Sequence, residues 1–117
     1  MKHVDTSRAK RLFKPVLASA SVQAAMMVLK PGESSSDEPE DEHPKAEQWL
    51  FVVSGTGRAK GRGQTVRIKA GSLLLIEKRE PHQITNTGNE PLMTVNFYAP
   101  PAYGADGEVK RSVKSKT

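Results

Sequence analysis

Two of the three histidines stand where imidazole chemistry would be useful. His43 ends a strongly acidic segment, just before a run of aromatic and β-branched residues, and His82 begins an alternating stretch after a second charged segment. The oxygen donors nearest to His43 in the sequence are Asp41, Glu42, Glu47 and Gln48. Two imidazoles with one or two oxygen ligands suit a divalent transition metal and leave room for water or a substrate. The sequence therefore predicts a metal site if the fold brings the two segments together.

The alternation of side chains along a strand separates some of these donors. If Leu50 and Val52 point into the protein, Gln48 does so too and Glu47 points outward. A register shift of one residue would reverse this assignment, so Glu47 stays an alternative ligand. The amide of Gln48 can also bind a substrate or the backbone with no metal involved.

Simpler roles for the same residues stay open. Asp41 belongs to a segment, residues 37–47, that carries six acids and one lysine, a composition that is also typical of solvated charges. His43 can be a loop histidine within that acidic patch, and His82 can be a structural side chain. His3 lies in a charged N-terminal stretch and carries no motif.

The absence of cysteine limits the chemistry. The chain has no cysteine at all, which excludes disulfides, thiolate metal sites and a cysteine nucleophile. A bound metal must then be held by imidazole, carboxylate, amide or water. Such ligands favour Fe, Mn, Ni, Zn or Cu over an iron–sulfur cluster, although they do not select one metal.

The elements that must position these side chains are predicted to be short strands. Alternating or wholly apolar runs, separated by glycine and proline turn signals, are typical of strands. They fall at residues 22–30, 48–54, 58–60, 65–69, 73–76, 82–86 and 92–98. Residues 33–46 are polar, contain two prolines and predict a loop between strands. Because no segment has the periodicity of an amphipathic helix, we expect a β-sandwich or β-barrel in this chain of 117 residues.

The net charge of +5 does not indicate a nucleic-acid surface. Residues 2–14 carry five basic side chains and residues 110–116 carry four, so half of the 18 lysines and arginines lie near the two ends. Such ends are typical of solvated tails, and no helix-turn-helix pattern accompanies them. The apolar runs are too short for a membrane span, and no signal-peptide pattern opens the sequence. We therefore expect a cytoplasmic protein with no nucleic-acid and no membrane partner.

Two stretches of the sequence resemble the motifs of the cupin superfamily. The second cupin motif, G-x5-P-x-G-x2-H-x3-N, agrees in spacing with Gly71, His82 and Asn86. Its proline position holds Glu77 and its turn-glycine position holds Arg79, so the chain departs from the motif twice.

The first cupin motif, G-x5-H-x-H-x3,4-E-x6-G, matches best at its end. His43 is followed after four residues by Gln48, and Gln48 after six residues by Gly55. The glutamate of the motif is thus replaced by Gln48, and its first histidine by Asp41. Carried over position by position, the resemblance implies a ligand set of Asp41, His43, Gln48 and His82. Two histidines and one carboxylate are similar to the facial triad that holds Fe(II).

The resemblance also implies the architecture. The expected fold is all-β, a double-stranded β-helix or jelly-roll cupin barrel over residues 21–103. An extended arm at residues 1–20 precedes it, and a polar tail at residues 104–117 follows it. Relatives of this kind often form homodimers, so we expect a homodimer in which the extended segment covers a sheet edge.

Two functional hypotheses follow, from different classes. In the first, a metal-dependent cupin acts on or binds a small organic molecule, with oxygenase, isomerase and lyase reactions all open. In the second, the missing first histidine marks a non-catalytic cupin module that binds a small molecule beside a degenerate metal site. Metal content after purification distinguishes the two hypotheses.

Overall fold

Eight β-strands make up the computed structural model, which describes residues 1–104. They are β1 (Phe13–Ala18), β2 (Gln23–Leu29), β3 (Glu47–Ser54), β4 (Thr56–Gly61), β5 (Gln64–Lys69), β6 (Leu73–Ile76), β7 (His82–Asn86) and β8 (Leu92–Ala99). The strands β2 to β8 lie where the sequence predicts strands, and the all-β class is confirmed. β1 is an additional strand, inside the N-terminal stretch that the sequence predicts to be extended.

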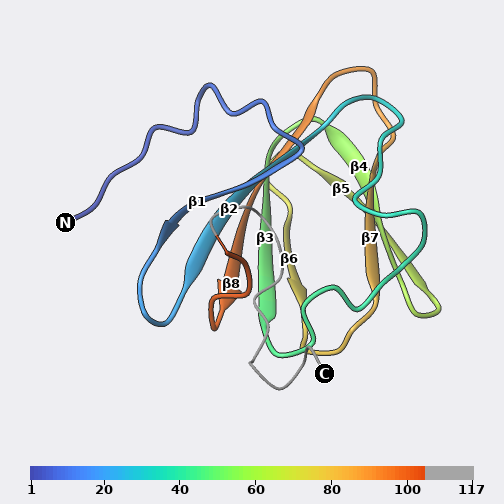
Figure 1. Cartoon of the computed structure of the whole chain (residues 1–117). Helices are drawn as coiled ribbons and strands as arrows, with labels where there is room; N and C mark the ends of the chain where they lie inside the picture. The colour runs from blue at the N-terminus through green and yellow to red at the C-terminus, as the bar shows by residue number, and fades with distance from the viewer. Residues whose placement is uncertain (105–117) are drawn as a thin grey trace.

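The strands form two antiparallel sheets that face each other (Figure 1). The large sheet has the order β1-β2-β8-β3-β6, and the small sheet has the order β5-β4-β7. Strands distant in sequence are therefore neighbours, as in the β2–β8 and β4–β7 pairs. This crossing between two sheets is typical of a jelly roll, which agrees with the double-stranded β-helix implied by the sequence.

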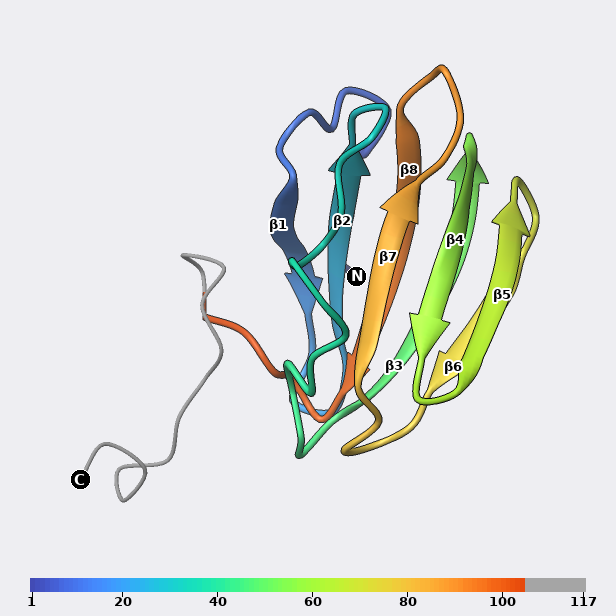
Figure 2. The same ribbon diagram turned by 90° about the vertical axis from the view of Figure 1, so that its right-hand side faces the viewer.

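The acidic loop pairs with the open edge of β7. Glu40 and His82 exchange backbone hydrogen bonds, with N···O distances of 3.1 and 2.9 Å, and the amide of Ser35 donates to the carbonyl of Ile84 at 2.8 Å. Figure 2 shows this segment running beside β7 on the side away from β4. The loop thus covers an edge that would otherwise be unpaired, and it ties residues 33–40 to the start of β7.

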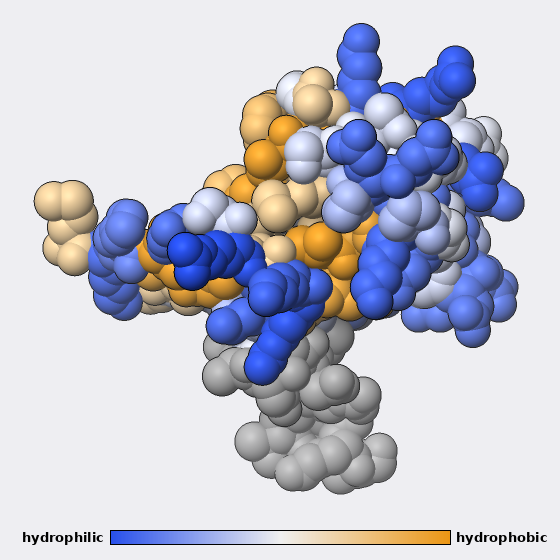
Figure 3. Space-filling view, turned by 90° about the horizontal axis from the view of Figure 1, so that it is seen from above, coloured by the Kyte–Doolittle hydropathy of each residue, from blue (hydrophilic) through white to orange (hydrophobic). Residues whose placement is uncertain are grey.

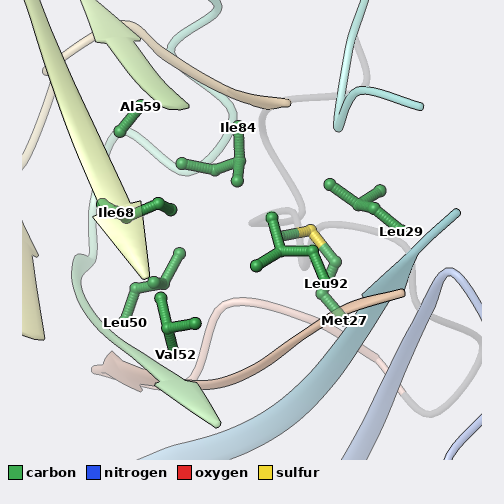
Figure 4. Close-up of a cluster of buried hydrophobic side chains, with 8 residues drawn as sticks. All are labelled: Met27, Leu29, Leu50, Val52, Ala59, Ile68, Ile84 and Leu92. Carbon is green, nitrogen blue, oxygen red and sulfur yellow. The ribbon is translucent and has the colours of Figure 1, made fainter. Parts of the chain in front are cut away.

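The apolar core fills one end of the space between the sheets. Its buried members are Met27, Leu29, Leu50, Val52, Ala59, Ile68, Ile84 and Leu92. Figure 4 shows these side chains, contributed by both sheets, gathered around a shared centre. Each fully buried aliphatic side chain of this size contributes about 1.5–3 kcal/mol through burial, so this cluster holds the two sheets together.

Three backbone positions with positive φ fall in the stretches that resemble the cupin motifs. Gly55 has a φ of 93°, and a Cβ added there would lie 2.5 Å from the carbonyl oxygen of Pro91. Gly71 turns between β5 and β6 with a φ of 92°. Arg79, at the motif's turn-glycine position, adopts a φ of 62°. For a residue with a Cβ atom, this left-handed conformation costs roughly 1–2 kcal/mol of conformational free energy.

The two ends of the chain differ from the barrel between them. The segment expected as an arm, residues 1–20, contains β1, and the backbone amide of Val28 donates to the carbonyl of Leu12 at 3.0 Å. The expected polar tail, residues 104–117, lies outside the described residues except for its first position. Nowhere in residues 1–104 does a helix form that is long and apolar enough to cross a membrane.

Candidate functional site

The fold brings the two histidines into ring contact. His43 precedes β3 of the large sheet and His82 opens β7 of the small sheet. Both side chains are buried, and their ring centroids lie 4.9 Å apart. The backbone pairing of Glu40 with His82 explains this closeness, because it fixes the loop three residues before His43 against the start of β7. The site lies at the end of the barrel where β3 and β7 both begin (Figure 1).

Each histidine uses its Nδ1 atom to bond a backbone carbonyl. His43 Nδ1 lies 3.0 Å from the oxygen of Ala46, and His82 Nδ1 lies 2.9 Å from the oxygen of Glu80. A carbonyl oxygen only accepts, so both Nδ1 atoms must carry the proton and donate. The Nε2 atom of a neutral ring then presents a lone pair. This is the arrangement in which metal-binding histidines are usually held.

Each Nε2 atom faces an oxygen that also accepts. His43 Nε2 lies 2.7 Å from Gln48 Oε1, and His82 Nε2 lies 3.4 Å from Glu42 Oε1. Lone pairs facing lone pairs repel, so these two contacts are favourable only with a cation between the partners. That cation is either a proton on the imidazole or a metal ion shared with the oxygen.

The orientation of the Gln48 amide is fixed by its neighbours. Gln48 Nε2 donates to Asn96 Oδ1 at 2.8 Å, and Asn96 Nδ2 donates to Thr94 Oγ1 at 2.9 Å and to the carbonyl of Ala25 at 3.3 Å. The Ala25 carbonyl can only accept, so it sets the direction of the whole chain of amides. Gln48 therefore turns its oxygen toward His43.

The neighbouring loop residues Asp41 and Glu42 differ in solvent exposure and in contact with His82. Glu42 is partly buried with its carboxylate against His82, whereas Asp41 is exposed. Burial alone lowers the pKa of His82, but the Glu42 carboxylate, the Glu80 carbonyl and the charge of Asp41 together raise this pKa above its usual value. Asp41 thus acts on the site through its charge, while Glu42 touches it.

Aromatic rings form one wall of the site. The ring of Tyr98 lies edge-on to that of His43 at 5.0 Å, and Tyr103 packs on Tyr98 at 4.9 Å and on Phe13 at 4.7 Å. Burial, together with the nearby Glu42 charge, raises the pKa of both tyrosines well above the usual value. Both phenols therefore stay protonated and keep a hydrogen to donate.

Gln23 holds the aromatic wall in place. Its Oε1 atom accepts from the amides of Ala102 and Tyr103 at 3.0 and 2.9 Å, and its Nε2 atom donates to the carbonyl of Tyr103 at 2.7 Å. Gln23 itself is buried. The segment after β8 is thereby bound to the barrel, with the Tyr103 ring 6.3 Å from that of His43.

A small cavity opens beside these groups. Its volume is about 180 Å³. Its polar lining comes from Ser35, Glu42, Gln48, His82, Tyr98 and Tyr103, and its apolar lining from Leu12, Phe13, Met27 and Ile84. The cavity has the volume of roughly six water molecules, which suits a small organic molecule rather than a large one.

The donor set fits a divalent metal in type. Of the residues predicted as ligands, His43, Gln48 and His82 come together, and Asp41 lies at the rim. Within residues 1–104, no three histidine, aspartate or glutamate side chains already converge closely enough to hold a metal ion. The two histidines, the Gln48 amide oxygen and the Glu42 carboxylate lie in neighbouring contacts, and these are ligand types that a divalent transition metal accepts.

Sequence reasoning did not single out the roles of Asn96, Tyr98 and Tyr103. Asn96 lies in β8, whose residues alternate between polar and apolar. From the sequence alone, a polar residue in such a strand can point either to the interior or to solvent. Tyr103 follows Pro100 and Pro101, which end the last predicted strand. An aromatic residue just after a strand was the available signal, because large rings are seldom left in solvent.

Comparison with known families gives a match over most of the barrel. The sequence model of the family described as "Cupin domain" matches residues 25–98. The chain is 31% identical over 72 residues to the tetracenomycin polyketide synthase protein TcmJ of Streptomyces glaucescens. That alignment covers 62% of this chain and 46% of TcmJ, so the chain matches less than half of that relative's length.

Solved structures share the fold. BH2720 from Bacillus halodurans superposes with a TM-score of 0.77 at 26% identity, covering 89% of this chain and 80% of that one. An RmlC-like cupin protein from Desulfovibrio desulfuricans gives 0.72 at 21% identity, with 86% and 98% covered. KdgF from Halomonas gives 0.68 at 17% identity, with 76% and 77% covered. At identities this low, the last two comparisons concern the fold alone.

Proposed function

The chain belongs to the cupin domain family, and from this premise we propose that it is a small metal-binding cupin that handles a small organic molecule. The cavity beside His43 and His82 is the place where that molecule would bind. The ligands are His43, His82 and Gln48, with a carboxylate from Glu42 or Asp41. The metal is a divalent ion of Fe, Mn, Ni, Zn or Cu, the ions that suit nitrogen and oxygen ligands.

One observation carries this proposal. Both histidines have their Nδ1 protons committed to carbonyl oxygens, and both Nε2 atoms face oxygens that accept. A single divalent ion would satisfy all four of these Nε2 and oxygen atoms at once. Protons would satisfy them only by placing two imidazolium ions 4.9 Å apart in a buried site, which is the costlier solution.

The protein groups around the cavity have their own tasks. A metal bound there supplies a Lewis acid that polarises a substrate oxygen or activates water or dioxygen. The phenols of Tyr98 and Tyr103 remain protonated, so they can donate hydrogen bonds to an oxygen of the bound molecule. Met27, Phe13 and Ile84 form the apolar part of the lining with Leu12 and exclude water there. The substrate is therefore expected to be compact, oxygen-bearing and partly apolar.

Metal analysis of protein purified without a polyhistidine tag tests the proposal. We expect near-stoichiometric metal in the wild type and its loss in His43→Ala and His82→Ala. His3→Ala is the matched control, because His3 is exposed at the N-terminus and should leave metal content unchanged. Comparing Glu42→Ala with Asp41→Ala then identifies the carboxylate ligand. Wild-type protein that binds no metal even after reconstitution would contradict the proposal.

A non-catalytic module that binds a small molecule is the second candidate. The exposed position of Asp41, where the cupin motif has its first histidine, favours it. In this case the two histidines bind an anionic or hydroxylated molecule directly through protonated Nε2 atoms. Nitrogen NMR during addition of the metal ion separates the candidates, because metal binding removes the proton from Nε2, whereas this role keeps Nε2 protonated whether or not metal is added.

A further inference from the structure

The outer face of the small sheet carries a row of positive charges. Four basic side chains on it form what we name the basic ladder. They are Arg58 and Lys60 of β4 and Arg67 and Lys69 of β5, and all four are exposed. Seen from above, this side of the molecule is hydrophilic, whereas hydrophobic side chains gather on the side of the large sheet (Figure 3). The sequence from residue 48 to residue 76 contains no acid, so β4 and β5 bring no negative charge to the ladder.

The strand register sets these like charges against one another. Arg58 of β4 pairs directly with Arg67 of β5. Lys60 is the diagonal neighbour of Arg67, and Lys69 is the diagonal neighbour of Arg58. Directly opposite side chains in a sheet have Cβ atoms about 5 Å apart, and like charges at this distance destabilise the pair. A bound anion would relieve this repulsion, so the face favours an anionic ligand.

The rest of the chain does not neutralise the basic ladder. The acidic loop lies along β7 and not over β4 or β5 (Figure 2). Its contact with the outer side of β7 is made by a serine, since Ser34 Oγ lies 2.7 Å from Thr85 Oγ1. Within residues 1–104, ion pairing involves only Glu42 and His82, which lie at the histidine site. The four cations of the ladder are therefore available to an external anion.

A hollow at one end of the basic ladder adds hydroxyl groups to the charges. Its volume is about 510 Å³, and its polar side chains are those of Arg67, Lys69, Thr56, Ser72 and Thr87. Ser72 Oγ accepts from the backbone amide of Lys69 at 2.9 Å, so its hydroxyl hydrogen remains available to donate. Two cations and several hydroxyl donors around one hollow are groups that bind a carboxylate well.

The composition of this face limits the class of ligand. The ladder extends over two strands, so one small anion cannot contact all of it. Single-stranded nucleic acid is disfavoured, because residues 56–72 include no aromatic side chain on which a base could stack. The major groove of a duplex admits a two-stranded ribbon, whereas β4 is the middle strand of a three-stranded sheet. Stable membrane binding needs an inserted apolar group besides basic charge, and the outward residues of β4 and β5 offer none.

We propose that the basic ladder is the docking surface for an acidic segment of another protein. Carboxylates on one side of such a segment lie about 5–7 Å apart, whether it is a helix or a strand, and this spacing is close to that of the ladder. Arg58 and Arg67 bind carboxylates through paired hydrogen bonds, and the hollow receives a further acidic side chain. Charge complementarity of this kind speeds association and selects the partner.

NMR titration of the full-length protein with a decaglutamate peptide tests the location of the surface. The peptide stands in for the acidic segment. We expect the backbone amides of Arg58, Lys60 and Arg67 to shift during the titration. The amides of Trp49 and Phe51, on the large sheet, should stay in place. This experiment uses the wild type, so it does not depend on the folding of a variant.

A charge reversal tests the contribution of the ladder to affinity. Arg58→Glu places a carboxylate opposite Arg67, and opposite charges in this position stabilise a strand pair, so the variant should fold. Fluorescence anisotropy with labelled decaglutamate should show binding at least about 10-fold weaker than in the wild type. Arg8→Glu is the matched control, because it changes the net charge equally at an exposed position before β1. It should bind like the wild type.

The outcomes separate this proposal from its competitors. Shifts confined to the small sheet, with weaker binding in Arg58→Glu alone, support it. Equal weakening in Arg58→Glu and Arg8→Glu overturns it, because binding would then follow net charge. Wild-type protein that does not bind the peptide at low salt also overturns it. A thymidine decanucleotide that shifts the same amides at lower concentration than the peptide would assign the surface to nucleic acid instead.

Discussion

The two ends of the barrel interior differ in polarity, although the same strands run through both: one end is apolar and the other contains buried polar side chains. At one end Leu50, Leu92 and Ile84 pack without a polar atom among them. At the other end His43 and Gln48 are buried just as deeply, and their buried nitrogen and oxygen atoms have hydrogen-bond partners. The apolar end stabilises the fold through contacts that tolerate exchange, whereas the polar end depends on directional contacts. On β3, the site residue Gln48 and the core residue Leu50 are thus only two positions apart.

The largest effect should come from the apolar end. Leu50→Ala removes a fully buried side chain between the sheets, so the free energy of unfolding should fall by about 2–5 kcal/mol. Metal content of the folded protein should stay unchanged, because no site residue moves. Urea denaturation and metal analysis measure the two quantities. Loss of metal from the folded variant would show that the two ends are not separate.

The next effect should come from the polar end. Asn96→Ala removes the partner that fixes the Gln48 amide, so Gln48 Oε1 is no longer held toward His43. Metal affinity should fall by about 10- to 100-fold, as when other supporting groups of metal ligands are removed. Titration with a competing chelator measures this affinity. The buried Thr94→Val change nearby is the control, since Thr94 does not contact Gln48 and should cost less affinity.

A smaller effect concerns pH. The raised pKa of His82 means that the folded chain favours its protonated form more than the unfolded chain does. In the metal-free protein, this contribution to stability is complete below about pH 6.5 and is lost as the pH rises through the raised pKa. Glu42→Gln should largely remove that pH dependence. Urea midpoints across this range measure it, with exposed Glu38→Gln as the control.

The smallest effect should come from backbone strain beside the site. Arg79 lies in the loop before His82 with a φ of 62°, which glycine adopts without a steric penalty. Arg79→Gly should therefore raise the free energy of unfolding by about 1 kcal/mol or less, because glycine also loses more entropy on folding. Thermal unfolding measures the gain. A decrease in stability would mean that the Arg79 side chain makes contacts that outweigh the strain.

The fold was predictable because its signals are local. Strands β3, β6 and β8 are marked by aromatic and β-branched runs, and the turns between strands are marked by glycines such as Gly55 and Gly71. These residues determine the backbone through short-range sterics, so a single sequence is sufficient to locate them. The spacing around His82 then pointed to a fold family as well as to strands.

The site was only partly predictable because its partners meet through long-range contacts. His43, Gln48 and His82 could be selected by spacing, and alternation correctly placed Gln48 on the face of Leu50 and Val52. The choice between Asp41 and Glu42 depends on how an irregular loop turns, and no periodicity governs that. From the sequence, Trp49, Phe51 and Phe97 could be interpreted only as core or interface residues. Apolar residues at every position of a strand show that both faces are apolar, without showing what lies on the second face.

The pairing of residues 33–40 with β7 has a consequence for how the cavity is reached. The cavity wall that contains Ser35 and Glu42 is one continuous loop segment. Hydrogen bonds such as those between Glu40 and His82 hold this segment to β7. Lifting this segment requires no separation of the two sheets, so it is a local opening of lower free energy than unfolding. The amides of Glu40 and His82 should accordingly exchange with deuterium together, ahead of the core. A metal or ligand in the cavity should slow both amides by the same factor, so hydrogen exchange would report binding without knowledge of the reaction.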